Sequence, residues 1–540
     1  MLSRVLLYLR TIRRMRPSMI VSRLCGGRRL SEHAFKGGHP VDIPHIAIPE
    51  LDLASRYLAR FDADSLIDGE FLLINERHSI DLDTWREPEA SHLWNFNLHY
   101  FEWGIALAAR WRETGSDSYL DCFKGLVSSW IVACPYPLGD AWHPYTISLR
   151  LVNWLIAVDL FDGQIERDVK FFDSLRKSIY CQYRHLLANQ ETHLRANHWW
   201  ENLKTLAIIS AMFRDHDTHA KVMRRLEDQL VEQILPDGVH FERSLMYHKL
   251  VLEGMLRVWL ASKQLNFELA ENFLSKLQLM LDAMASLEHG MGKTPFFNDS
   301  ADGVAKESDF LIAACKQLLG MEADDSKTIF PNAGYYKLYD GDISAMIDAG
   351  EPGPPYMLGH AHCDCLSFEL SYRGKPVIVN SGTYAYQNDL RSYFRSTAAH
   401  NTCVVGDEEQ LEYWGEHRVG RSYRNVEAEE ITDKCLKIAM TLPSGRRLLR
   451  TFMLLEGSCV YIEDCVEHAK RSGIESFIHV APQASASVSI ERGSLRVFEG
   501  VFSPEFGVLK TSRVFSAEST DKISFFLFVG NKEKGAFLES

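Results

Sequence analysis

Apolar residues recur with a helical period between about residues 50 and 320. The clearest stripes, in which apolar side chains follow one another at spacings of mostly three and four residues, are Leu203, Leu206, Ile209 and Phe213, and then Leu252, Met255, Leu256, Trp259 and Leu260. Such spacing places the apolar side chains on one face of a helix, and this face must be buried against other elements. We therefore expect the region to be a set of packed α-helices.

After about residue 330 the pattern changes to short alternating runs separated by turn residues. Residues 436–442, the turn 443–445 and residues 448–455 predict a β-hairpin, and residues 459–466 predict a further strand. The C-terminal part should therefore be an antiparallel β-sandwich. We divide the chain of 540 residues into a basic N-terminal segment, 1–50, a helical domain, 51–326, and a β domain, 327–540.

The composition is that of a soluble globular protein, with 46% apolar and 24% charged residues. The net charge of −13 disfavours nucleic-acid binding, so no nucleic-acid partner is expected, and an acidic substrate would need a locally basic cleft. Eleven cysteines, an odd number without a regular framework, favour mostly free thiols in a reducing compartment.

The N-terminal segment is strongly basic, with eight arginines and no acidic residue before Glu32. Its longest apolar run, 5–9, is too short for a secretory signal, and no stretch is long enough to span a membrane. We expect an uncleaved cytoplasmic protein. A helix here could lie on the anionic inner membrane, beside polysaccharide-synthesis machinery, or pack on its own protein, and we favour the second arrangement.

Aromatic residues mixed with Asn and His interrupt the helical pattern at 94–101, 142–145, 197–201 and 247–248. Aromatic side chains alone would usually be core. The mixture is typical of a solvent-filled cleft in which aromatic side chains stack on sugar rings and Asn and His side chains hydrogen-bond the sugar hydroxyl groups.

Residues 359–370 have the pattern of a strand. Its alternation would place His360, His362 and Asp364 on one face, with Cys363 and Cys365 on the other. Because buried polar groups need partners, this face indicates either a functional site or a hydrogen-bonded polar cluster without a function.

Five motifs follow one another along the chain: NHWWEN (197–202), ERSLMYH (242–248), GHAHCDCLSFEL (359–370), VNSGTY (379–384) and AHNT (399–402). In this order they resemble the heparinase II/III-like polysaccharide lyases, which include heparin, heparan sulfate and alginate lyases. The strings are also similar to heparinase-like proteins associated with bacterial capsule and exopolysaccharide production. The resemblance implies an (α/α) toroid followed by an antiparallel β-sandwich, in agreement with the helix-then-strand pattern.

Lyases of this kind remove the weakly acidic C5 proton of a uronic acid, so the neighbouring carboxylate must be neutralised. The resemblance implies that Asn197 and His198 neutralise it, that Tyr247 transfers a proton, and that His360 is the catalytic histidine. We expect the substrate to be held by other residues of the same motifs and nearby loops, namely Trp199, Glu201, Glu242, Tyr386 and Arg395, with Tyr386 or Tyr393 as a second phenol.

The resemblance also implies a structural zinc held by His362, residue 380 and His400. Position 380 is Asn in this chain, and a neutral amide is a much poorer zinc ligand than a carboxylate. Asp364 could supply the missing carboxylate. Otherwise the cluster is a metal-free hydrogen-bond network.

Three functions remain open. The leading hypothesis is β-elimination on a uronate-containing bacterial glycan, during capsule or exopolysaccharide metabolism. The second is a glycoside hydrolase, which needs two opposed carboxyl groups, for which the candidates are Glu242, Asp299 and Asp302. The third is a non-catalytic glycan-binding assembly protein, and the Asn at position 380 lends it support.

Overall fold

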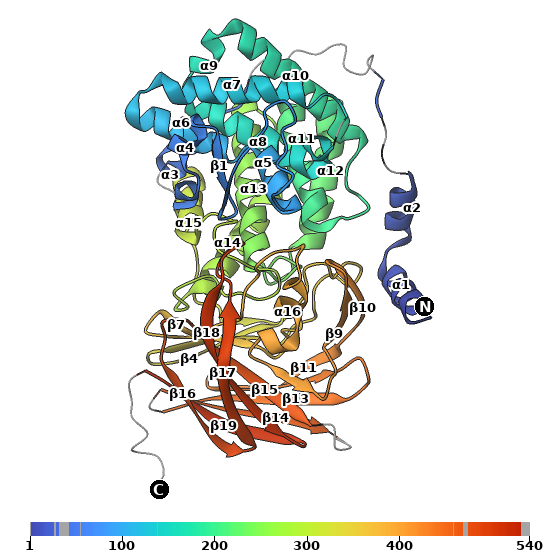
Figure 1. Cartoon of the computed structure of the whole chain (residues 1–540), viewed down its shortest axis with the longest axis vertical. Coiled ribbons are helices and arrows are strands. Elements are labelled where there is room, and N and C mark those ends of the chain that lie inside the picture. The colour runs from blue at the N-terminus through green and yellow to red at the C-terminus, as the bar shows by residue number, and fades with distance from the viewer. Residues whose placement is uncertain are drawn as a thin grey trace.

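The protein folds into a helical body followed by a β part (Figure 1). The structure is a computed structural model, and it describes residues 2–25, 27, 29–31, 43–53, 56–137, 139–456, 458–467 and 473–530. In Figure 1 the helices form the upper part and the sheets the lower part, and α1 and α2 lie along one side of the molecule, with α1 near strand β10.

The helical body carries a small hairpin, β1 (Glu70–Leu73) and β2 (Glu76–Ser79), and short 3-10 turns. Its helices are α3 (Pro49–Asp52), α4 (Ala63–Ile67), α5 (His92–Tyr100), α6 (Trp103–Thr114), α7 (Asp117–Ala133), α8 (Pro144–Leu160), α9 (Gln164–Arg167), α10 (Val169–Ala188), α11 (Ala196–Met212), α12 (His216–Gln233), α13 (Leu245–Leu265), α14 (Phe273–Glu288) and α15 (Ser308–Leu319).

Three helices, α8, α11 and α13, form the inside of this body. Almost every side chain of α8 and α11 and most of those of α13 are buried, whereas α7, α10 and α12 bury one face only. The inner helices pack in the order α8, α11, α13, and the outer helices cover them. The two predicted apolar stripes lie on α11 and α13, which confirms the prediction of packed helices.

The β part contains two large antiparallel sheets and a separate two-stranded hairpin of β9 and β10. One has the order β11-β12-β13-β14-β19-β16, and the other runs β17-β18-β15-β7-β6-β5-β4-β3, with β8 paired to β15. Phe368 of the second sheet meets Phe452 of the first edge to face at 4.9 Å between ring centroids, so the sheets form a sandwich around one apolar core. The predicted hairpin is confirmed, because β12 and β13 pair up to Thr441 and Arg447.

The strands of the β part begin after α15, which ends at Leu319. They are β3 (Ile329–Phe330), β4 (Tyr335–Asp340), β5 (Ile343–Asp348), β6 (Phe368–Tyr372), β7 (Lys375–Ile378), β8 (Cys403–Val405), β9 (Leu411–Trp414), β10 (Arg418–Ser422), β11 (Arg424–Ile431), β12 (Cys435–Thr441), β13 (Arg447–Leu455), β14 (Cys459–Glu467), β15 (Ile474–Val480), β16 (Ala486–Arg492), β17 (Ser494–Phe502), β18 (Lys510–Ser519) and β19 (Lys522–Val529). A short helix, α16 (Arg391–Arg395), follows β7.

The predicted strand at 359–370 is wrong over most of its length, since only its last residues belong to β6. The backbone before β6 bonds to other loops instead of to a neighbouring strand. Cys363 N–H donates to Arg395 O at 3.0 Å, and His360 O accepts from Asp299 N–H at 3.0 Å. Leu366 has a φ of 62°, which a strand cannot contain. Strand alternation therefore does not decide where His360, His362 and Asp364 point.

Two helices precede the helical body, α1 (Leu2–Arg14) and α2 (Pro17–Cys25). α1 packs on the β9–β10 hairpin, and Met19 of α2 lies in a small apolar cluster with Phe241 of the helical body and Tyr356 of the β part. Among the described residues no helix is long and apolar enough to cross a membrane. The ten cysteines whose side chains are described are all free thiols, in agreement with the prediction of mostly free thiols.

Candidate active site between the helical body and the sandwich

A cavity of about 300 Å³ lies between the inner helices and the loops of the sandwich. Its helical wall comes from α5, α8, α11 and α13, and its opposite wall from loops of the β part. Among the residues that line it are Asn197, His198, Tyr247, His360 and Tyr386. Four of the predicted catalytic residues, which come from three distant segments of the chain, therefore meet in one cleft.

Asn197 and His198 lie in the first turn of α11, where the positive end of the helix dipole favours an anion. Asn197 Nδ2 donates to Tyr145 Oη at 3.2 Å, and Asn197 Oδ1 is buried without a partner in the described chain. His198 Nδ1 lies 2.9 Å from Glu191 Oε1, and its ring lies against Tyr145. Partial burial alone would lower the pKa of His198, but the Glu191 carboxylate raises it above the usual value.

Tyr247 lies in the first turn of α13 and reaches across the cleft to the loops of the sandwich. Its Oη is 2.7 Å from Tyr386 Oη and 3.3 Å from His360 Nδ1. Burial raises the pKa of both Tyr247 and Tyr386 above the usual value for a phenol. Both phenols are therefore protonated at neutral pH, and Tyr247 joins the two walls of the cleft.

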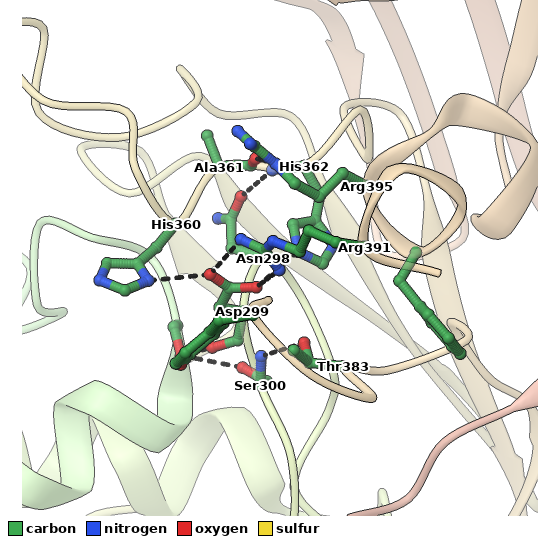
Figure 2. A network of polar contacts seen from close by, with 12 residues as sticks. Asn298, Asp299, Ser300, His360, Ala361, His362, Thr383, Arg391 and Arg395 are labelled. Atoms are coloured by element: carbon green, nitrogen blue, oxygen red, sulfur yellow. Dashed lines mark hydrogen bonds and ion pairs between the residues drawn. The ribbon is translucent and has the colours of Figure 1, made fainter. Parts of the chain in front are cut away.

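Asp299 organises the loop wall, and it lies on the segment between α14 and α15 (Figure 2). Its Oδ2 is 2.8 Å from His360 Nδ1, its Oδ1 is 2.8 Å from His362 Nε2, and Arg391 holds both oxygens. Burial would raise the pKa of Asp299, but the Arg391 guanidinium and the two imidazoles hold it well below the usual range. The carboxylate therefore stays charged and orients both rings.

The neighbours of Asp299 fix its segment in place. Asn298 Oδ1 accepts from His362 N–H at 3.1 Å, Asn298 N–H donates to Asp364 Oδ2 at 2.6 Å, and Ser300 N–H donates to Thr383 Oγ1 at 3.2 Å. Figure 2 shows this segment lying against the loop that carries His360 and the start of α16, which carries Arg391. Asp364, which we considered as a substitute zinc ligand, thus binds a backbone N–H.

The three residues predicted to hold zinc lie together, but in a chain of hydrogen bonds. Asn380 Oδ1 is 3.2 Å from His400 Nδ1, and His400 Nε2 is 3.2 Å from His362 Nδ1, whose other nitrogen faces Asp299. Asn380 and His362 thus meet opposite nitrogens of the His400 ring, so the three donors do not converge on one point. Two neutral imidazoles and one amide oxygen, in this arrangement, are a poor ligand set for a zinc ion.

A different group has donor atoms close enough to hold a metal ion. Atoms of Asp299, His360 and His417 all lie within 4.8 Å of one another. The Arg391 guanidinium already compensates the Asp299 carboxylate, and a second positive charge there would be repelled.

Two family models cover almost all of this architecture. The model for the heparinase II/III N-terminus matches residues 57–327, and the model for the heparinase II/III-like C-terminal region matches residues 324–529. The chain belongs to the heparinase II/III family. The resemblance recognised in the motifs is thereby confirmed.

Curated relatives of the family are similar to this chain at low identity. A heparin-sulfate lyase of Pedobacter heparinus is 23% identical over 366 residues, which cover 62% of this chain and 54% of that protein. A heparin-sulfate lyase of Bacteroides thetaiotaomicron is 23% identical over 372 residues, which cover 59% of this chain and 53% of that protein. The chain therefore spans about half the length of the curated relatives it matches.

Solved structures share the fold. The structure of heparinase III has a TM-score of 0.69 at 16% identity, covering 93% of this chain and 89% of that one. A mutant heparan sulfate lyase of Pedobacter heparinus has a TM-score of 0.60 at 17% identity, covering 98% and 88%. The predicted architecture, a toroid followed by an antiparallel β-sandwich, is confirmed.

The predicted substrate-binding residues divide into two groups. Glu201 and Tyr386 line the cleft. Trp199, Glu242 and Arg395 are not among its lining residues, so the structure does not place them against a substrate.

Each of these three has a supporting role instead. Trp199 donates its indole N–H to Gln190 Oε1 at 3.1 Å, on a face of α11 away from the cleft. Glu242 is buried and accepts the backbone N–H of Asn197, and burial raises its pKa. Arg395 binds Ala361 O and Glu416 O, both at 3.1 Å, and so holds the loops that carry His360 and His417.

Several residues of the site were missed in the sequence or given another role. In the sequence, Asp299 was considered only as a carboxyl group for hydrolysis. The polar triplet 298–300, which follows two phenylalanines, could have indicated a functional loop. Glu191, Arg391 and His417 carried no signal, since each lies outside the five motifs. Tyr145 lay in a recognised aromatic segment but had no assigned role.

Proposed function

We propose that this protein is a polysaccharide lyase that cleaves a uronic-acid-containing glycan by β-elimination. The observation that carries the proposal is the meeting of Asn197, His198, Tyr247 and His360 in one cleft, with Tyr247 in hydrogen-bond reach of His360. These residue types match the three tasks of elimination, which are neutralising a carboxylate, removing a proton and protonating a leaving oxygen.

Asn197 and His198 are suited to neutralise the uronate carboxylate. Both lie in the first turn of α11, and the Glu191 carboxylate holds the pKa of His198 above its usual value despite burial. A charged imidazole and an amide facing the same region can bind the two carboxylate oxygens. They lower the energy of the enolate that forms when the C5 proton leaves.

His360 is suited to act as the base and Tyr247 as the acid. Asp299 Oδ2 accepts a hydrogen bond from the Nδ1–H of His360, and in this tautomer the lone pair lies on Nε2. In the proposed step His360 Nε2 takes the C5 proton, the C4–C5 double bond forms and the C4–O4 bond breaks. The leaving O4 then takes the Tyr247 proton, which the raised pKa keeps on the phenol until that moment.

The hydrolase alternative lacks its carboxyl pair. None of its three candidates, Glu242, Asp299 and Asp302, is among the described residues that line the cleft. Asp299 is neutralised by Arg391, and the carboxylates that do line the cleft are each held in ion pairs. Hydrolysis needs two carboxyl groups on opposite sides of the bond, so the cleft favours elimination.

The charges of the cleft support a substrate without sulfate groups. Four lysine and arginine side chains of the described chain line it, and all four are already paired. Each is in an ion pair with a carboxylate: Arg60 with Glu102, Lys204 with Glu201, and Arg257 and Lys306 with both Asp52 and Glu253. A sulfate there would have to compete with a buried carboxylate. We propose a glycan whose charge is carried by its carboxylates alone.

Incubation with a panel of uronate glycans tests both proposals. The panel should contain polymers with one backbone in unsulfated and sulfated forms, and the readouts are ultraviolet absorbance of unsaturated ends and product masses. We expect unsaturated products from unsulfated polymers and much slower cleavage of sulfated ones. Products heavier by one water per cut would establish hydrolysis. Binding of the glycan without cleavage would establish the assembly role.

The link to bacterial capsule or exopolysaccharide metabolism is part of the proposal, and it rests on the motif resemblance. The paired cations of the cleft support the unsulfated substrate, and the metabolic role is a separate part of the proposal. Cytoplasmic location stays a prediction, and fractionation of cells that produce the protein tests it.

A further inference from the structure

Helix α1 is held to the sandwich by its polar edge. Arg10 pairs with Glu412, Thr11 Oγ1 accepts from Trp414 Nε1 at 3.0 Å, and Arg14 Nη2 donates to Ser422 Oγ at 2.7 Å. Arg10 and Thr11 lie four and three positions before Arg14, so all three share one side of the helix. The usual arrangement of an amphipathic helix, with the apolar face inward, is therefore reversed here.

The opposite face of α1 is apolar and exposed. Val5, Leu9 and Ile12 follow one another at spacings of four and three, and their exposed fractions are 50%, 57% and 47%. Leu6 flanks them and is also exposed, whereas Tyr8 is half exposed and its ring meets Trp414 edge to face at 4.6 Å. Of the twenty large apolar side chains exposed in the described chain, seven lie before residue 25, so the apolar surface is concentrated on this segment.

Helix α2 extends the same kind of surface. Met19 anchors it in the helical body, Ser22 bonds to Thr192, and Arg16 pairs with Glu232. Its outward residues Val21 and Leu24 are 58% and 81% exposed. Both helices are therefore fixed to the protein by one side and present apolar side chains on the other.

The charge around this surface is positive, in contrast to the net charge of −13 of the whole chain. Arg4 and Arg13 are exposed and have no ion pair with any residue that the structure describes. An apolar stripe flanked by unpaired arginines is complementary to an anionic bilayer, which offers acyl chains beneath a layer of phosphates.

We propose that the outer face of α1 and α2 docks on an anionic lipid bilayer, with the helices lying in the plane of the interface. The apolar stripe of Val5, Leu9 and Ile12 enters the boundary between headgroups and acyl chains, and Arg4 and Arg13 bind lipid phosphates. The polar edge of α1 keeps the sandwich attached, so the enzyme is held at the surface. The proposal does not depend on the reaction that the cleft catalyses.

Flotation of the full chain with vesicles tests the docking. One set contains phosphatidylcholine alone, and the other contains about one quarter phosphatidylglycerol. We expect binding to the anionic vesicles only, and at least about tenfold weaker binding at high salt, because salt screens the arginines. Absence of binding to the anionic vesicles would overturn the proposal.

Two variants separate the apolar and the basic contributions. V5S/L9S/I12S removes the outward stripe and should reduce binding by at least about tenfold, and R4Q/R13Q should reduce it and weaken its salt dependence. V132S, at a position that is 81% exposed on α7, is the matched control and should bind like the unchanged protein. Melting temperatures should be unaffected, since all these side chains point outward.

The oligomeric state distinguishes a membrane from a second copy of the chain. We expect a monomer in the absence of lipid. A dimer that V5S/L9S/I12S converts to a monomer would show that the stripe is a self-association surface, and the proposal would then be wrong. Vesicle binding that the same variant leaves unchanged would also contradict it.

Discussion

The two walls of the cleft are built differently. Asn197, His198 and Glu201 project from one face of a buried helix, whose backbone satisfies its own hydrogen bonds. His360 and Tyr386 lie on loops without such internal support, and Asp299, Arg391 and Arg395 hold the loop wall in position through side-chain bonds. The helical wall is positioned by packing and the loop wall by a polar network.

Carboxylate binding and proton transfer therefore depend on differently built parts of the cleft. Binding of the carboxylate falls to the helical wall and proton transfer to the junction of both walls, where Tyr247 meets His360. Damage to the network should therefore affect proton transfer more than binding. The predictions below test this division, from the largest expected effect to the smallest.

Tyr247→Phe should have the largest effect, because it removes the hydroxyl that links α13 to His360 and Tyr386 inside the cleft. We expect kcat to fall by about 10² to 10⁴-fold, the usual contribution of acid–base catalysis, with little change in KM. Tyr336→Phe, a buried tyrosine on β4 outside the cleft, is the matched control and should keep full activity. Near-normal turnover in a folded Tyr247→Phe variant would exclude the proposed acid.

Asp299→Asn should break the loop wall while leaving the helical wall intact. The amide no longer compensates the buried Arg391 or fixes the His360 tautomer, so we expect a loss in kcat of roughly 10²-fold and a lower melting temperature. Since Asp299 acts by positioning His360, the pH dependence of kcat should also change.

Asp464→Asn provides the control for stability. Asp464 forms a buried pair with Arg450 at 2.7 Å within the sandwich, so this variant should lose comparable stability but keep its kcat when folded. Equal losses of kcat in both variants would show that Asp299 matters only for folding.

Glu191→Gln tests the helical wall through pH. Burial lowers the pKa of His198 and the Glu191 carboxylate raises it to above the usual value, so in the native protein the charged imidazole persists to higher pH. If charged His198 binds the substrate, kcat/KM falls as pH rises through this pKa. Without the carboxylate the fall should begin at lower pH, with a loss of about tenfold near neutrality. An unchanged alkaline limb in a folded variant would contradict this role.

Asn380→Asp should have the smallest effect on the reaction. It tests whether the cluster of His362, residue 380 and His400 can bind a metal ion. We expect no stoichiometric zinc in the unchanged protein. The added carboxylate supplies the charge that two imidazoles lack, and binding also requires the His400 ring to turn so that the three donors converge. Zinc content should then rise, and zinc should raise the melting temperature of the variant. Stoichiometric zinc in the unchanged protein that survives dialysis against a mild chelator would refute the metal-free network.

Local patterns in the sequence were sufficient for the elements and the family. The stripes of α11 and α13 and the β12–β13 hairpin follow from residues close together in the chain, because period and turn chemistry act over a few positions. The spacing of Asn197 and Glu201 correctly placed both on one helix face, and both line the cleft. Trp199 of the same motif points elsewhere, since two positions along a helix turn a side chain by more than half a circle.

Only the tertiary structure decided how the loop wall works. The segment before β6 alternates like a strand, yet its backbone bonds go to Asp299 and Arg395, which lie tens of residues away. Whether a carboxylate acts as a catalyst, a ligand or an orienting group depends on which charges surround it, and Arg391 reaches Asp299 across 92 positions. The pairing of the basic side chains is a second example. The sequence contains 59 lysines and arginines, and only the structure shows that the four in the cleft are each paired with a carboxylate. Electrostatic interactions depend on distance through the folded molecule, and no local pattern encodes it.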